Sequence, residues 1–136
     1  MSRVQVTICL LLAVLAICRA RHTNEQIQMI QPHYDTCVER NGLQDAPKIA
    51  DAGLAELVTR TDDVSKKVIQ CVLLRLNLID CQGTVKRKRF EAFYEDGHEV
   101  DSLPGVINGC TQRKGTALEK TFNFYKCFFE QKTFVI

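Results

Sequence analysis

The positions of its seven cysteines constrain the fold of this 136-residue chain more than any other feature. Two of them fall in residues 1–20, which we predict to be a signal peptide. Arg3 precedes an apolar run over residues 4–17, and the small residues Cys18 and Ala20 fit the −3 and −1 positions of a cleavage site. We therefore expect the protein to be secreted into an extracellular, oxidising environment, where cysteines pair.

The other five cysteines belong to the mature chain, residues 21–136, whose length predicts a single domain. They are Cys37, Cys71, Cys81, Cys110 and Cys127. Because their number is odd, one thiol is left over. The spacing does not reveal the pairing, since each choice of the leftover cysteine leaves three ways of joining the other four.

The charge of the mature chain argues against several classes of partner. Removal of Arg3 and Arg19 lowers the number of lysines and arginines from 18 to 16, which equals the 16 aspartates and glutamates. A chain without net charge has no general attraction for nucleic acid or for an anionic membrane. No segment after the signal peptide is apolar for 18 residues, so no membrane-spanning helix is predicted.

Helix signals dominate the mature chain, and strand signals are nearly absent. The predicted helices cover residues 23–40, 46–57, 62–76, 84–94, 102–110 and 116–131. Thr23 or Asn24 can cap the first helix, whereas Pro32 should kink or split it, because proline lacks a backbone donor. Each helix would bury one stripe of side chains, and the stripes must meet around a common interior.

The last predicted helix carries an unusual number of aromatic side chains on two adjacent stripes. The stripes consist of Leu118, Phe122, Tyr125 and Phe129, and of Thr121, Phe124 and Phe128. These rings either form solid core or line a cavity for an apolar guest. Periodicity alone does not distinguish the two.

Two segments resemble helices of the insect odorant-binding proteins. Residues 71–80, CVLLRLNLID, resemble the third helix of that family from its third cysteine onward. Residues 118–127, LEKTFNFYKC, resemble its last helix, which ends at the sixth cysteine. The family spaces its second and third cysteines as C-x3-C and its fifth and sixth as C-x8-C. Lys67 and Leu118 stand at the second and fifth positions, so the chain resembles the minus-C subgroup, which lacks that bridge.

The resemblance extends over the whole mature chain and implies an all-α fold. That fold is a compact bundle of about six short helices around an internal hydrophobic cavity, stapled by two disulfides. The implied bridges are Cys37–Cys71 and Cys110–Cys127. Cys81 falls outside this frame. We interpret it as a free thiol, with an intermolecular bridge or an altered pairing as the alternatives.

The resemblance also implies a function. The chain would be a secreted soluble carrier that binds odorants, pheromone-like compounds or other lipophiles and transports them through aqueous fluid. A membrane receptor is a candidate partner, no cofactor or metal is expected, and the chain would be a monomer or weak homodimer. Without the bridge between Lys67 and Leu118, either the cavity opens more easily and accepts more varied ligands, or core contacts compensate for the lost bond and binding is unaffected.

The helical stripes supply candidate ligand-binding residues, among which Tyr94, Thr121 and Tyr125 could orient a ligand's oxygen. The full set is Val68, Val72, Leu76, Phe90, Phe93, Tyr94, Leu103, Val106, Ile107, Thr121, Phe122, Tyr125, Phe128 and Phe134. The apolar residues 134–136 are expected to fold over the cavity mouth as part of its wall, with packing on the outside of the protein as the alternative. His98, near Glu95 and Glu99, is the candidate pH-sensing residue.

An enzyme is not predicted, because the chain has no Gly-x-Ser-x-Gly, His-Glu-x-x-His or phosphate-loop motif. The alternative to a carrier is a secreted helical signalling or venom-like protein that acts through its surface. On that hypothesis the aromatic stripes are solid core, and the basic run at residues 86–89 or Cys81 makes the contact. We expect the run to be a solvated helix face, with Phe90 and Phe93 turned inward.

Overall fold

The computed structural model describes residues 22–49, 53–96 and 101–131, and this part of the chain is helical. Its six helices are α2 (Asn24–Asn41), α3 (Gly53–Leu57), α4 (Asp63–Arg75), α5 (Arg87–Tyr94), α6 (Leu103–Cys110) and α7 (Ala117–Glu130). Within the described ranges the only β-pairing is one isolated bridge, which confirms the predicted all-α fold. The predicted signal peptide, His98 and residues 134–136 lie outside these ranges.

Side-chain caps define where three of the helices begin. At α2, the Thr23 hydroxyl accepts the backbone N–H of Gln26 at 3.2 Å, and the Gln26 side chain accepts that of Thr23 at 3.0 Å. Asp62 and Thr116 each accept the backbone N–H three residues on, at the starts of α4 and α7. Such caps satisfy backbone donors that the first helical turn leaves open. The predicted starts of these three helices are thereby confirmed.

Helix α2 is continuous across Pro32 and is not split there. Proline removes the donor that would bond the carbonyl of Gln28, four residues earlier. Both Gln28 and Pro32 are exposed, so that carbonyl lies on the side of the helix that faces water. The Thr36 hydroxyl also donates to the Pro32 carbonyl at 3.0 Å. The helix therefore continues because its proline lies on the solvent side.

Helix α3 is shorter than the predicted helix over residues 46–57. Residues 46–48 are not helical, and α3 begins only at Gly53. Pro47 disfavours the helical region for the residue before it. Its carbonyl instead accepts the buried Tyr34 hydroxyl at 2.6 Å.

Helix α5 also begins later than predicted, at Arg87 instead of Thr84. Val85 forms an antiparallel bridge with Ile79, and the backbone N–H of Lys86 donates to the Leu78 carbonyl at 2.9 Å. These contacts attach residues 85 and 86 to the preceding loop and keep them out of the helix. As predicted, the basic run 86–89 is exposed, while Phe90 is buried and Phe93 is half-buried.

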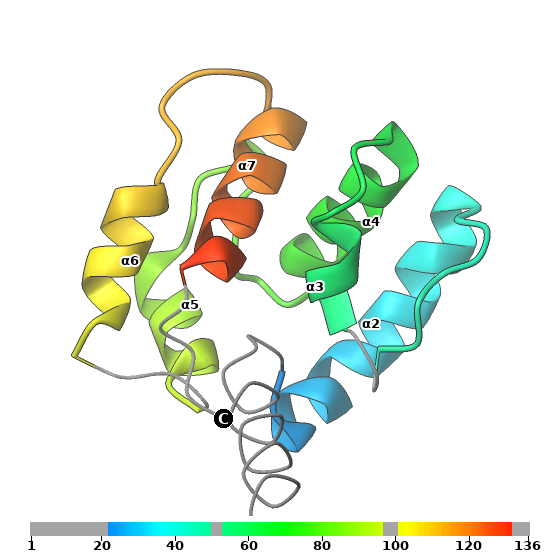
Figure 1. Ribbon diagram of the computed structural model, residues 1–136, viewed down its shortest axis with the longest axis horizontal. Helices are drawn as coiled ribbons and strands as arrows, with labels where there is room; N and C mark the ends of the chain where they lie inside the picture. The colour runs from blue at the N-terminus through cyan, green and yellow to red at the C-terminus, as the bar shows by residue number, and fades with distance from the viewer. Residues whose placement is uncertain (1–21, 50–52, 97–100, 132–136) are drawn as a thin grey trace, which may run out of the picture.

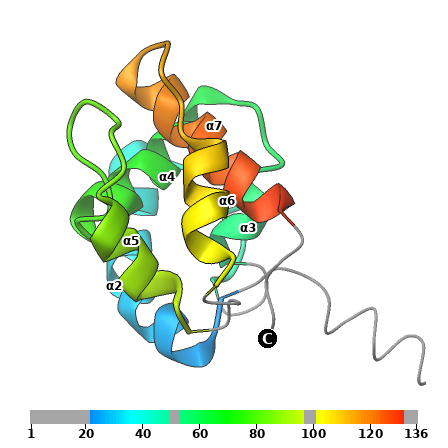
Figure 2. The same cartoon turned by 90° about the vertical axis from the view of Figure 1, so that its left-hand side faces the viewer.

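Four helices follow one another across the molecule in the order α2, α4, α7, α6, with α5 packed beside α6 (Figures 1 and 2). The Cys37–Cys71 bridge joins α2 to α4, and the Cys110–Cys127 bridge joins α6 to α7. Both implied bridges are confirmed. They secure the two outer contacts of the row and leave the central contact, between α4 and α7, without a covalent link.

Noncovalent contacts join α4 to α7 at the place where the resemblance puts the missing bridge. Lys66 lies next to Lys67, and its Nζ is 3.3 Å from the carboxylate of Glu119, next to Leu118. The same ammonium lies 5.0 Å from the centre of the Phe122 ring. Because the Glu119 side chain is 44 % exposed, water and salt screen the ion pair, which contributes about 0–1 kcal/mol at most.

Cys81 is a free, exposed thiol in the loop between α4 and α5. The Asp80 carboxylate accepts the backbone N–H groups of Gln82 and Thr84, each at 2.9 Å, which closes the loop and lowers the pKa of Asp80. Gly83 has a φ of +81°, and a Cβ built there would lie 2.7 Å from the Ala117 carbonyl oxygen. Glycine thus lets the loop pack against the start of α7.

Candidate functional site

The aromatic side chains of α5 and α7 form the centre of the buried interior. Phe90 is fully buried, and its ring meets those of Phe124 and Phe128 edge-on at centroid distances of 5.1 and 4.8 Å. Tyr94 lies one turn after Phe90, and its ring centre is 4.9 Å from that of Phe128. Edge-on packing is the arrangement that aromatic quadrupoles favour.

The structure brings nearly all the predicted ligand-binding residues into this interior. The buried ones are Val68, Val72, Phe90, Tyr94, Leu103, Ile107, Thr121, Phe122, Tyr125 and Phe128. Leu76, Phe93 and Val106 are half-buried and pack against the same cluster. Phe134 lies outside the described residues. The helical stripes therefore predicted which side chains face inward, because burial on a helix follows its periodicity.

The proposed polar anchors differ in what they contact. The Thr121 hydroxyl donates its hydrogen bond to the Ala117 carbonyl at 2.8 Å, within α7, so it has no second hydrogen to donate to a ligand. The hydroxyls of Tyr94 and Tyr125 instead hydrogen-bond to each other, between α5 and α7. Both also lie against a residue that sequence reasoning did not select, His22. Its Nε2 is 3.0 Å from the Tyr94 oxygen and 3.2 Å from the Tyr125 oxygen.

These three side chains, which we call the His22–Tyr94–Tyr125 cluster, form a polar site inside an aromatic shell. His22 is 5 % exposed, and its ring also meets that of Phe129 edge-on at 5.4 Å. The sequence holds no signal for this role, because His22 precedes the first helix and belongs to no periodic stripe. Its partners follow it by 72 and 103 residues.

Burial keeps the cluster electrically neutral at neutral pH. Desolvation lowers the pKa of His22 to about 4 and raises the pKa values of Tyr94 and Tyr125 above their usual range. The imidazole is therefore uncharged and both phenols stay protonated. A neutral imidazole has one nitrogen that donates and one that accepts a hydrogen bond. The Nδ1 atom of His22 is buried and has no hydrogen-bond partner.

Contacts between α2 and α5 hold this end of the molecule together. The amide of Gln26, in the first turn of α2, donates to the carbonyls of Phe93 and Asp96 at 3.0 and 2.7 Å. The start of α2 is thus attached to the end of α5. Because His22 lies just before α2, the same contacts place its ring beside Tyr94.

A comparison with protein families assigns this helical frame. The model of the PBP/GOBP family matches residues 19–131, which include every described helix and both bridges. The chain belongs to the PBP/GOBP family, the insect odorant-binding proteins. Members are secreted, soluble binding proteins of odorants and pheromones and are not enzymes. No individual curated protein matches the chain.

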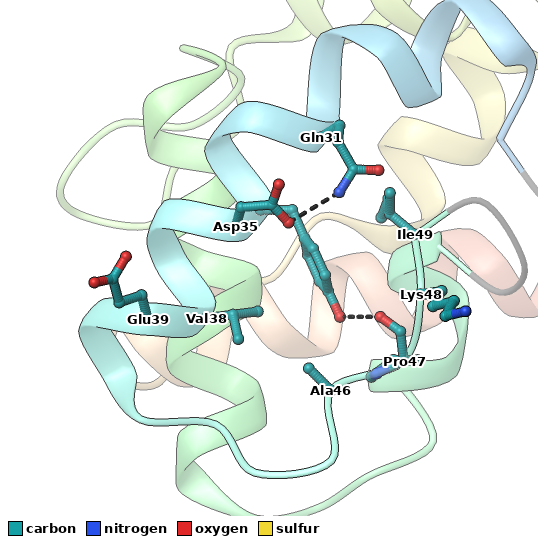
Figure 3. Close-up of a pocket in the computed structure, with 9 residues that line it drawn as sticks. Gln31, Asp35, Val38, Glu39, Ala46, Pro47, Lys48 and Ile49 are labelled. Atoms are coloured by element: carbon teal, nitrogen blue, oxygen red, sulfur yellow. Dashed lines mark hydrogen bonds between the residues drawn. The ribbon is translucent and has the colours of Figure 1, made fainter.

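Two open surface grooves flank α2 of this PBP/GOBP-family chain. The first has a volume of about 490 Å³, and Figure 3 shows Asp35 and Glu39 on its α2 wall with Lys48 opposite. Burial raises the pKa of Tyr34 at its base to about 12. The second, of about 530 Å³, lies between α2 and α4. It is lined by Arg40, Asn41, Lys67, Gln70, Cys71, Leu74 and Arg75. No predicted ligand-binding residue lines either groove.

Neither a membrane-spanning helix nor a metal-binding group occurs within residues 22–49, 53–96 and 101–131. No helix in this part of the chain is both long and apolar enough to cross a bilayer. No three histidine, cysteine, aspartate or glutamate side chains in the described ranges come together as a metal-binding group.

Proposed function

We propose that the protein is a secreted carrier that binds small hydrophobic molecules in its aromatic interior and transports them through aqueous fluid. Membership of the PBP/GOBP family carries this proposal. On this proposal residues 1–20 are a signal peptide, and residues 21–136 form the working domain. The carrier acts as a monomer or weak homodimer and delivers its ligand to a membrane receptor.

The composition of the interior supports binding of apolar ligands. Phe90, Phe124 and Phe128 provide aromatic surface, while the phenols of Tyr94 and Tyr125 add polar groups. An apolar lining with a few convergent polar groups is typical of small-molecule sites. Burial of ligand surface supplies roughly 25 cal/mol per Å² before the costs of association, which predicts micromolar affinity for a tolerant site.

We expect a ligand to enter the interior where rings of α5 and α7 now touch each other. Phe90 and Phe128 are in edge-on contact with their ring centroids 4.8 Å apart, so a guest that entered between these two rings would have to separate them. Entry at this place would involve small movements of α5 relative to α7. The contact between α4 and α7 has no covalent bond either, so α7 should move more easily relative to α4 than it would with a third bridge, in line with a broad ligand range.

The test is a fluorescence titration of the oxidised mature chain with an environment-sensitive naphthylamine probe. We expect saturable one-to-one uptake and micromolar displacement by long-chain alcohols and aldehydes. The matched control is Met29→Ala, since Met29 is 54 % exposed and offers apolar surface outside the interior. Its titration should equal that of the unmodified chain. A folded chain with both bridges that takes up no probe would overturn the carrier function and favour the surface-acting alternative.

A further inference from the structure

The unpartnered Nδ1 of His22 distinguishes that side chain from the rest of the buried interior. Within the described ranges it is the one buried side-chain nitrogen or oxygen atom without a hydrogen-bond partner. The great majority of buried polar atoms in folded proteins are hydrogen-bonded, and leaving one unpaired costs free energy. The opposite nitrogen of the same ring already contacts two phenols.

The surroundings of the ring define what could satisfy that atom. The described side chains that contact His22 are Tyr94 on α5 and Tyr125 and Phe129 on α7. None of them carries a formal charge at neutral pH. A charged ligand group would therefore lose its hydration and find no opposite charge among these neighbours, and the free energy cost of burying such an unpaired charge is high. A neutral oxygen atom on an otherwise apolar molecule would form a hydrogen bond with Nδ1 and would bring no charge into these surroundings.

We infer that His22 Nδ1 is the atom that recognises a ligand's oxygen, so that the protein prefers neutral oxygenated lipophiles over hydrocarbons and carboxylates of equal length. This inference rests on the proposed carrier function and specifies its ligand class. Depending on which ring nitrogen bears the hydrogen, Nδ1 donates to a carbonyl oxygen or accepts from a hydroxyl. Tyr94 and Tyr125 act as positioning residues, because their hydroxyls hold the other nitrogen.

The experiment compares four ten-carbon ligands, decane, decan-2-one, 1-decanol and decanoate, by displacement of the naphthylamine probe at pH 7.5. In the unmodified chain the ketone or the alcohol should bind more tightly than decanoate. The ratio of the decane Kd to the Kd of that oxygenated ligand measures the preference for the oxygen. In His22→Phe this ratio should fall by about five- to tenfold, which corresponds to the loss of one net hydrogen bond. The matched control is His33→Gln, which alters a partly exposed histidine of α2 whose Nδ1 accepts a hydrogen bond from Arg75 of α4. It should leave the ratio unchanged.

The two proposals fail in different ways. If no ligand displaces the probe, or no probe binds, the carrier function itself fails. If ligands bind but the ratio is the same in His22→Phe as in the unmodified chain, the inference about His22 is overturned and the carrier function stands. If His22→Phe does not fold, the imidazole ¹⁵N resonances of the unmodified chain decide. The His22 Nδ1 signal should shift with decan-2-one or 1-decanol and stay in place with decane, and equal behaviour with all three would overturn the inference.

Discussion

The burial of His22 predicts that the protein loses stability between neutral and mildly acidic pH. Desolvation lowers the pKa of His22 from 6.5 to about 4 in the folded chain, whereas the unfolded chain keeps the ordinary value. Between these two values the unfolded state binds a proton that the folded state does not. Acid therefore favours unfolding, and the free energy of unfolding falls as the pH drops below 6.5.

The size of the effect follows from the two pKa values. Each pKa unit of difference corresponds to about 1.36 kcal/mol. Between pH 7.5 and pH 4.5, His22 alone should lower the free energy of unfolding by about 2.5 kcal/mol. Asp62 and Asp80 have lowered pKa values because they accept backbone N–H groups, so they stabilise the folded state above their ordinary pKa. Their contribution is lost mainly below pH 4, outside this window.

Urea unfolding at several pH values between 4.5 and 7.5 measures this dependence. His22→Phe keeps an aromatic ring but cannot titrate. The change in its free energy of unfolding between pH 7.5 and pH 4.5 should therefore be smaller than that of the unmodified chain by about 2.5 kcal/mol. The absolute stability of the variant does not enter the comparison. His33→Gln is the matched control and should retain the steep dependence. Equal pH dependence in His22→Phe and the unmodified chain would refute the argument that buried His22 stays neutral.

Three further predictions concern the core, the missing bridge and the free thiol. Phe90→Ala should lower the free energy of unfolding by about 3–5 kcal/mol, because Phe90 is fully buried against three rings. The half-buried Phe93→Ala should cost less in the same urea titration, and equal costs would contradict the burial argument. Lys67→Cys with Leu118→Cys should form an α4–α7 bridge, add about 4 kcal/mol in the loop-entropy picture and slow ligand uptake in stopped-flow measurements. Unchanged uptake and ligand range would make the missing bond irrelevant to binding. Cys81→Ser should change the free energy of unfolding by less than about 0.5 kcal/mol and leave both bridges intact in non-reducing peptide maps, whereas an altered map would show that Cys81 exchanges with them.

Helix starts were predictable wherever the signal was local. Thr23, Asp62 and Thr116 cap helices through contacts with residues three positions on, and their side chains suit that role in any fold. The predictions went wrong where distant contacts decided. Residues 46–48 are not helical, and the carbonyl of Pro47 accepts a hydrogen bond from a tyrosine of α2. Helix α5 starts late because residue 85 pairs with residue 79.

The two bridges illustrate a different limit. Spacing alone left every pairing of the five cysteines open, and the resemblance to odorant-binding proteins selected Cys37–Cys71 and Cys110–Cys127. The fold then places each pair on adjacent helices, with Cα–Cα distances of 5.8 and 5.5 Å. These distances lie within the range that a disulfide can span.

The sequence by itself determined the helical class and the inward faces of the helices, because both depend on periodicity and local capping. It could therefore identify the buried aromatic side chains of α5 and α7. Only the tertiary structure placed His22 against Tyr94 and Tyr125, because that contact joins the start of α2 to two other helices. Its chemistry also depends on the folded state. The imidazole is neutral and unpaired at Nδ1 because the surrounding rings exclude water, and no local pattern in the sequence encodes that exclusion.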